Sequence, residues 1–119
     1  MRSLFRIFVT VSAALLLMVG LSWIGPSGHA QETAVSVQIS VTNHRFQPAE
    51  IHAASNKPIM LRIKNFDATP MEFESVTLRV EKVVAGNSEG IIRLRALSPG
   101  RFDFFDDFHP ESRGTLVVQ

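Results

Sequence analysis

Residues 99–118 have the sequence PGRFDFFDDFHPESRGTLVV, and this stretch decides which fold the chain can adopt. It predicts a strand with the alternating aromatic residues Phe102 and Phe104, a tight turn, and a second short strand over residues 115–118. Because successive side chains of a strand point to opposite faces, Asp106 continues the register of the two aromatic residues. Its carboxylate is therefore expected to point inward at the end of a sheet.

An inward carboxylate is costly unless a positive charge or a metal ion accompanies it. His109 follows Asp106 by three residues, beside Pro110, where it can supply a second metal ligand. The alternatives are that Asp106 caps the turn, since Asp is a common turn residue, and that His109 is a solvent-exposed turn histidine. The inward register of Asp106 favours the metal site. Asp107 falls on the opposite face, where it is either a further ligand or a solvated side chain.

The rest of the chain after residue 34 shows the same alternation of apolar and polar side chains. Turn-forming residues such as Asn43, Pro58, Gly86 and Gly100 separate the alternating runs. This pattern is typical of half-buried antiparallel strands, and no stretch has the periodicity of a long amphipathic helix. An all-β sandwich of about seven strands is therefore expected, with strands over residues 35–41, 51–53, 59–63, 78–80, 92–94, 102–104 and 115–118.

The connection over residues 65–75 is longer than the others and contains Met71, Glu72 and Glu74. Loops on a rigid sandwich often carry binding groups. Met71 is either a metal ligand or a filler of the core, which methionine often is. Of Glu72 and Glu74, one is expected to face the site as a ligand and the other to be solvated.

The first thirty residues are predicted to be a secretory signal peptide. Arg2 and Arg6 precede an apolar run over residues 7–23, and the segment ends in the small residues Gly28 and Ala30. An uncleaved membrane anchor is the alternative, because the run is nearly long enough to span a bilayer. Cleavage leaves one domain over residues 31–119. An exported domain of this kind is expected in a bacterial periplasm.

The composition excludes several classes of function. The chain has 12 Lys and Arg against 11 Asp and Glu, so no strong charge or basic stripe suggests nucleic-acid binding. No nucleophile elbow, phosphate-binding loop or zinc motif of the HExxH kind is present, and no small-molecule substrate is indicated. Cysteine is absent, so stability must come from packing, with a contribution from any bound metal.

Three segments, in the same order along the chain, resemble the cupredoxins, and together they cover nearly all of residues 31–119. Phe46-Gln-Pro48 is similar to the family's entry into its second strand. Residues 65–73 resemble the segment with its first copper-ligating histidine, and residues 99–118 resemble the closing hairpin with the remaining ligands. The resemblance implies a Greek-key β-sandwich or barrel with a metal site at one end.

The resemblance also implies an altered ligand set. Asp106 takes the position of the family's thiolate, and the first histidine position falls on Met71 or, with a shift of one residue, on Glu72. The second histidine is retained as His109. Blue-copper electron transfer depends on a Cys thiolate among two histidines, so a type 1 copper site is excluded.

Two further positions belong to the implied metal end. The axial methionine has no clear counterpart, and Glu111 or Ser112 occupies the shortened loop. His44 lies at the tip of the first turn, which borders the metal end in a cupredoxin-like sandwich, and is expected as an outer or second-site ligand. Carboxylate and imidazole suit Cu(II) and iron, whereas a thioether favours Cu(I).

Residues 71–75, 81–84 and 104–111 resemble the cysteine-free cupredoxin-like proteins of Ftr-type bacterial iron permeases. The chain is also similar to the N-terminal domain of Efe-type periplasmic iron-uptake proteins, without their helical domain. This resemblance implies a periplasmic protein that binds copper, iron or both and acts with an iron permease or a periplasmic iron-binding protein. Oxidation of Fe(II) is one role that it implies. A periplasmic copper carrier and a metal-free interaction module remain as alternatives.

Overall fold

The computed structural model describes residue 25 and residues 33–119. The expected signal peptide, apart from Gly25, lies outside the described residues. Within the described part of the chain, no helix is long and apolar enough to cross a membrane.

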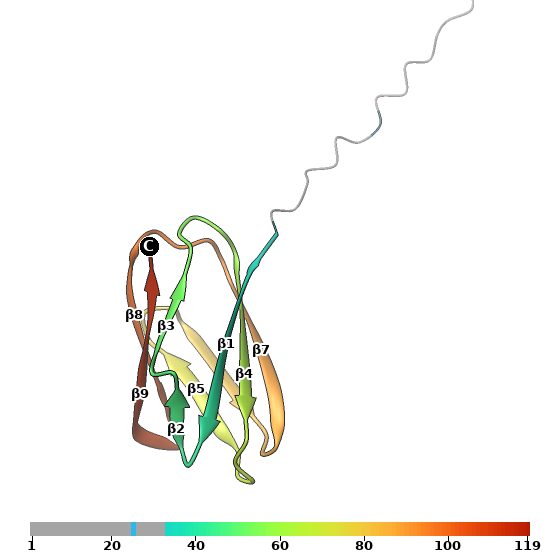
Figure 1. The fold of residues 1–119 in the computed structure, drawn as a ribbon, viewed down its shortest axis with the longest axis vertical. Helices are drawn as coiled ribbons and strands as arrows, with labels where there is room; N and C mark the ends of the chain where they lie inside the picture. The colour runs from blue at the N-terminus through green and yellow to red at the C-terminus, as the bar shows by residue number, and fades with distance from the viewer. Residues whose placement is uncertain (1–24, 26–32) are drawn as a thin grey trace, which may run out of the picture.

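Two β-sheets face each other across a shared core (Figure 1). One sheet has the strand order β2-β1-β4-β7, with β1 Val35–Thr42, β2 Arg45–Gln47, β4 Ile59–Asn65 and β7 Ser88–Leu94. The other has the order β3-β9-β8-β5-β6, with β3 Glu50–Ala53, β5 Met71–Ser75, β6 Val80–Val84, β8 Gly100–Asp106 and β9 His109–Val118. The predicted all-β sandwich is thus confirmed, with nine strands in the described residues rather than seven.

The additional strands are β2 and β5. The segment Met71–Ser75, expected to be part of a loop, pairs with β6 and alternates buried and half-buried side chains. The strand expected over residues 78–80 is wrong in part. Residues 76–79 form a turn in which Arg79 has a φ of 56°, and β6 begins only at Val80.

Two strand pairs are parallel rather than antiparallel as expected. β1 pairs with β4 in parallel, from Val35↔Ile59 onward, and β3 pairs with β9 in parallel. Between β1 and β4 the chain passes through β2 and then through β3 in the opposite sheet. It therefore returns to the first sheet in the direction of β1. Local alternation of side chains contains no information about such non-local pairing.

Three phenylalanines join the two sheets in the core. Phe46 comes from β2, Phe73 from β5 and Phe104 from β8. The Phe46 and Phe104 rings meet edge to face at 4.9 Å between centroids, and those of Phe73 and Phe104 are stacked at 4.8 Å. Burial of each such side chain stabilises the fold by about 1.5–3 kcal/mol. The aliphatic residues packed with this cluster include Ile39, Val41, Leu61, Ile63 and Leu116.

Asn65 fixes the loop between β4 and β5 at one end of the sandwich. Its buried side chain donates to the carbonyls of Thr69, at 2.8 Å, and Ala85, at 3.2 Å, and its Oδ1 accepts the N–H of Asp67 at 3.0 Å. This loop lies at the same end as the β1–β2 and β8–β9 turns, because Asp67 in the loop accepts the N–H groups of Asn43 and His44, and the His44 ring contacts that of His109. The candidate site is built from these three connections.

Candidate functional site

Asp106 points inward at the end of β8, as predicted, and is fully buried. Its Oδ1 accepts the backbone N–H groups of Glu72 and Phe108, both at 3.0 Å. Its Oδ2 lies 3.1 Å from Nδ1 of His109. The partner that an inward carboxylate requires is thus an imidazole together with two N–H groups. Every buried side-chain nitrogen and oxygen in the described part of the chain has a hydrogen-bond partner.

His44 lies directly against His109. The two rings are stacked, with centroids 3.7 Å apart and an interplanar angle of 18°. His44 occupies a two-residue turn between β1 and β2, in which Asn43 and His44 have φ values of 51° and 60°. Two successive left-handed residues are typical of the tight hairpin turn that matches strand twist. The structure therefore brings His44, Asp106 and His109 together at one end of the sandwich, where the resemblance implied a metal site.

Asp67 is a site residue that the sequence analysis missed. Its carboxylate accepts the backbone N–H groups of Asn43 and His44, both at 2.8 Å, and its Oδ2 lies 3.5 Å from Nδ1 of His44. These bonds, with the His44 N–H as the largest cause, hold the pKa of Asp67 below its ordinary value of 3.8. The spacing Asn65-x-Asp67 at the start of a loop, a common Asx-turn pattern, is the available sequence signal.

Each imidazole of the stacked pair therefore has its own carboxylate beside Nδ1. His44 faces Asp67 and His109 faces Asp106. The side chains of His44 and His109 remain 42% and 27% exposed, so solvent reaches both rings. Histidines that bind metals generally direct their other ring nitrogen to a carboxylate or carbonyl in this way. Imidazole and carboxylate are also the donors that suit Cu(II) and iron.

Met71 is in the core. It is 1% exposed and shares the inner face of β5 with Phe73, whose register partner on β8 is Asp106. Its thioether therefore lies on the same side of the sheet as the Asp106 carboxylate. Of the two roles expected from the sequence, its burial fits the filler of the core.

Glu72, Glu74 and Asp107 form a separate carboxylate cluster on the outer face. One oxygen of each lies within 4.8 Å of the others, and in the described residues no other His, Asp and Glu side chains converge in this way. Partial burial and the nearby carboxylates of Asp107 and Glu81 raise the pKa of Glu72 and Glu74 above the ordinary value of 4.5. Glu72 and Glu74 therefore lie with Asp107 on the outer face of the sheet, whereas the Asp106 carboxylate lies on the inner face.

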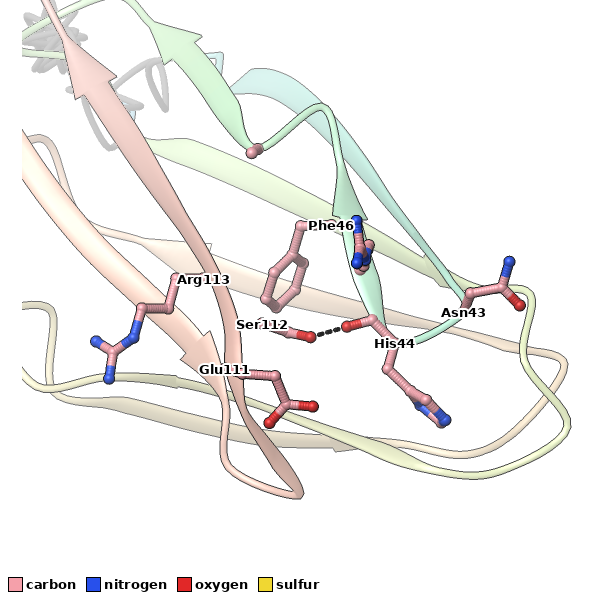
Figure 2. A pocket seen from close by; sticks show the side chains of 8 residues that line it. Asn43, His44, Phe46, Glu111, Ser112 and Arg113 are labelled. Carbon is pink, nitrogen blue, oxygen red and sulfur yellow. Dashed lines mark hydrogen bonds between the residues drawn. The ribbon is translucent and has the colours of Figure 1, made fainter.

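Glu111 lies on β9, beside a hollow in the surface (Figure 2). The exposed Glu111 side chain and the His44 side chain line the same hollow. Between them, Ser112 donates a hydrogen bond to the His44 carbonyl. Ser112 therefore ties β9 to the turn that presents His44.

A comparison with models of known protein families shows which family the chain belongs to. Residues 13–118 match the model described as Cupredoxin-like domain. The chain belongs to this family. This cupredoxin-like domain has a curated relative, the uncharacterized protein RP394 of Rickettsia prowazekii (strain Madrid E). The two are 34% identical over 88 residues, which cover 73% of this chain and 70% of the relative.

Solved structures confirm the cupredoxin fold. The metal-binding domain of the Cu(I) exporting P-type ATPase CopA of Streptococcus pneumoniae D39 has a TM-score of 0.62 at 15% identity, over 74% of this chain and 92% of that domain. An apo copper binding protein has a TM-score of 0.62 at 13% identity, over 73% and 98%. An oxidized amicyanin variant has a TM-score of 0.59 at 17% identity, over 70% and 81%. At these identities the likeness concerns the fold.

Proposed function

We propose that this cupredoxin-like protein binds copper, iron or both, and that it serves iron uptake together with a membrane iron permease or a periplasmic iron-binding protein. The observation that carries the proposal is the pair Asp106 Oδ2 and His109 Nδ1, 3.1 Å apart, with the His44 ring stacked alongside. Asp106 and His109 stand where the resemblance to cupredoxins puts a thiolate and a histidine.

The donor atoms determine which metals fit. With no cysteine in the chain, nitrogen and oxygen atoms replace the thiolate, and these donors suit Cu(II) and iron rather than a blue-copper centre. His109 and His44 are partly exposed, so a metal can reach them from solvent. Asp106 is already hydrogen-bonded throughout, so its carboxylate binds a metal only in competition with His109. The two histidines are therefore the primary candidate ligands, with Asp106 as their buried support.

Calorimetric titration with Cu(II), Fe(II) and Fe(III) tests the binding. The variant His109→Gln removes the imidazole and keeps an N–H donor for Asp106. We expect micromolar or tighter binding by the unmodified protein and a loss of more than about tenfold in this variant. His52→Gln is the matched control, because His52 also pairs with a carboxylate, Glu50 at 3.1 Å, but lies on the exposed outer face. Binding weaker than micromolar by the unmodified protein would favour the metal-free interaction module.

The role in iron uptake rests on the resemblance to permease-associated proteins, and the outer carboxylate cluster of Glu72, Glu74 and Asp107 supports it through its oxygen donors. Cells that lack the protein are expected to accumulate less iron at limiting iron concentration. Loss of Fe(II) in air, faster with the copper-loaded protein than with copper alone, would identify an oxidase role. If Fe(II) is lost equally fast with the copper-loaded protein and with copper alone, the protein only binds the metal and passes it on.

A copper carrier is the second candidate function, because two of the similar solved structures are described by their copper binding or copper export. Reduced copper tolerance in cells without the protein, at unchanged iron accumulation, would favour this function. Both functions require export, which the predicted signal peptide over residues 1–30 provides. Sequencing the N-terminus of the protein from a periplasmic fraction tests export, with Gln31 expected as the first residue.

A further inference from the structure

We propose that the outer face of the sheet β2-β1-β4-β7 docks on a bilayer of anionic phospholipids (Figure 1). This face combines uncompensated positive charges with exposed apolar side chains, whereas acidic side chains gather on the outer face of the other sheet. The inference goes beyond the proposed function, because it concerns a sheet face rather than the end of the sandwich and does not depend on a bound metal.

Basic side chains follow one another along the outer face of β4 and β7. On β4, Arg62 and Lys64 alternate with buried aliphatic residues, so both side chains point outward. On β7 the exposed Arg93 does the same, and Arg95 continues the alternation directly after the strand. Glu89 is the only acidic residue of these two strands, and it forms an ion pair with Arg62 at 3.0 Å. Within the described residues, Lys64, Arg93 and Arg95 have no ionic partner on this basic face.

Two large apolar side chains lie exposed among these charges. Ile91, 40% exposed, is the register partner of Arg62 across the pair of β4 and β7. Phe66, 61% exposed, follows Lys64 by two residues. Its N–H donates to the Val41 carbonyl at 2.9 Å, which extends the pairing of β4 with β1, and its side chain lines the same hollow as Lys64. The Phe66 ring therefore belongs to the basic face and lies next to Lys64.

The rest of the basic face does not oppose an anionic surface. β1 lies beside β4 and presents the uncharged side chains of Ser36, Gln38 and Ser40 on the same side. Basic residues near an anionic bilayer are attracted by its phosphate groups, and apolar side chains among them enter the boundary between headgroups and acyl chains. The basic face offers both kinds of contact on one side of a sheet. Charge complementarity therefore favours an anionic phospholipid surface as its partner.

The other sheet gives the molecule an electrostatic direction. Glu72, Glu74 and Asp107 converge on its outer face, and Glu81 is the register partner of Glu74; these four residues form the acidic face. The whole chain has a formal net charge of only +1, so its net charge alone attracts it weakly to an anionic bilayer. The separation of charge between the two sheets would instead turn the basic face toward the lipid and the acidic face away from it.

Sedimentation with lipid vesicles tests the docking. The metal-free protein over residues 31–119 is used, because it contains both sheets and the whole described core, and because the apolar run over residues 7–23 would insert into any vesicle. Vesicles of phosphatidylglycerol and phosphatidylcholine in equal amounts should bind it at least about tenfold more tightly than vesicles of phosphatidylcholine alone. The difference should disappear when the Debye length falls from about 10 Å at about 0.1 M salt to about 3 Å at about 1 M salt.

Neutral variants locate the charges that matter. Lys64→Gln and Arg93→Gln should each weaken binding to the mixed vesicles about fivefold, and together about 25-fold, the effect expected for basic residues near an anionic surface. Arg101→Gln is the matched control, because it removes the same charge from the exposed outer face of β8. It should change the binding by less than about twofold. An equal loss in Arg101→Gln would show that only the net charge matters and would overturn the assignment of the face.

Tryptophan fluorescence identifies the part of the molecule that touches the lipid. Trp23 is the only tryptophan of the chain, so residues 31–119 contain none. Phe66→Trp should show a blue-shifted emission with the mixed vesicles. Phe108→Trp, at an exposed ring in the β8–β9 turn, is the control and should show no shift. A shift of the same size in Phe108→Trp would place the end of the sandwich on the bilayer and overturn the proposal.

Two further outcomes would overturn the proposal. One is equal binding to both kinds of vesicle. The other is self-association without vesicles that is lost in Arg93→Gln, which would identify the acidic face of a second copy as the partner of the basic face. Because no metal is present in any of these measurements, their failure would leave the proposed metal binding standing, and failure of the metal titrations would leave the docking standing.

Discussion

At the scale of single residues, Asp106 shows how one buried carboxylate can organise a turn. Its oxygens accept N–H groups from β5 and from the β8–β9 turn, in addition to the contact with His109. The alternation of Phe102, Phe104 and Asp106 predicted the inward direction of this side chain, because register is a local property. The contribution of Asp67 was not predictable in the same way. Its partners are backbone N–H groups at residues 43 and 44, far away in the sequence.

Asp106→Asn is expected to destabilise the protein by about 1–3 kcal/mol, the cost of leaving a buried hydrogen-bonding group without a partner. The amide oxygen can still accept both backbone N–H groups, but the NH2 group then faces Nδ1 of His109 and is left without a partner unless the proton of that ring moves to Nε2. Urea unfolding, followed by far-UV circular dichroism, measures the loss. Asp107→Asn is the control, since the neighbouring side chain is exposed, and should cause no loss of stability.

At the scale of single elements, β5 combines an apolar inner face with an acidic outer face. Met71, Phe73 and Ser75 are buried, and Glu72 and Glu74 are half-buried on the other side. The sequence pattern did contain this alternation, but Pro70 and the preceding loop residues obscured it. The pairing of β5 with β6 and β8 provided the hydrogen bonds that make it a strand.

The acidic face of β5 predicts a pH-dependent stability. The pKa of Glu74 is raised in the folded state, by partial burial first and then by Asp107 and Glu81. The ionised form is therefore disfavoured in the fold, and stability is lost as the pH rises through 4.5 toward the raised pKa. Glu74→Gln is expected to have a higher Tm than the unmodified protein at pH 7 and the same Tm below about pH 4.

Glu89→Gln provides the comparison for this titration. Glu89 forms an ion pair with Arg62 at 3.0 Å, so its neutralisation should give no gain in Tm at pH 7. A Tm of Glu74→Gln that stays above that of the unmodified protein at acid pH would show that the effect is unrelated to charge.

Gly114 in β9 gives a prediction about packing. A Cβ at this position would overlap the ring of Phe104 and approach the Ala49 carbonyl to 2.8 Å. Gly114→Ala is expected to destabilise the protein by about 1–3 kcal/mol through overpacking. At Gly100 the nearest atoms to an added Cβ belong to Phe102 at 3.5 Å, which is an ordinary contact. Gly100→Ala should therefore unfold at nearly the same urea concentration as the unmodified protein.

At the scale of the whole molecule, the sequence predicted the fold class and the proximity of Asp106 and His109, and it left the connectivity open. Alternation in residues 35–41 and 59–63 predicts two half-buried strands. Their parallel pairing depends on the path of the chain through β2 and β3. The resemblance to cupredoxins placed the first histidine position on Met71 or, with a shift of one residue, on Glu72. In the structure these two side chains lie on opposite faces of β5.

The aromatic cluster determines how the two sheets depend on each other. Phe73→Ala is expected to cost about 3–5 kcal/mol, a large part of the roughly 5–15 kcal/mol that stabilises a domain. Because Phe46 comes from the other sheet, both sheets should melt in a single transition at lower temperature. Phe108→Ala, at a side chain that is 46% exposed, serves as the control. A similar loss of stability in both variants would contradict this account of the core.

The stacked histidines lie across the seam between the two layers, since His44 belongs to the hairpin of one sheet and His109 to the hairpin of the other. Any ligand that binds both rings would therefore link the two sheets. Binding of such a ligand would raise the free energy of unfolding by RT ln(1 + [L]/Kd), which is about 2.7 kcal/mol when the ligand concentration is a hundred times Kd. A protease would accordingly cleave the ligand-bound protein more slowly than the free protein.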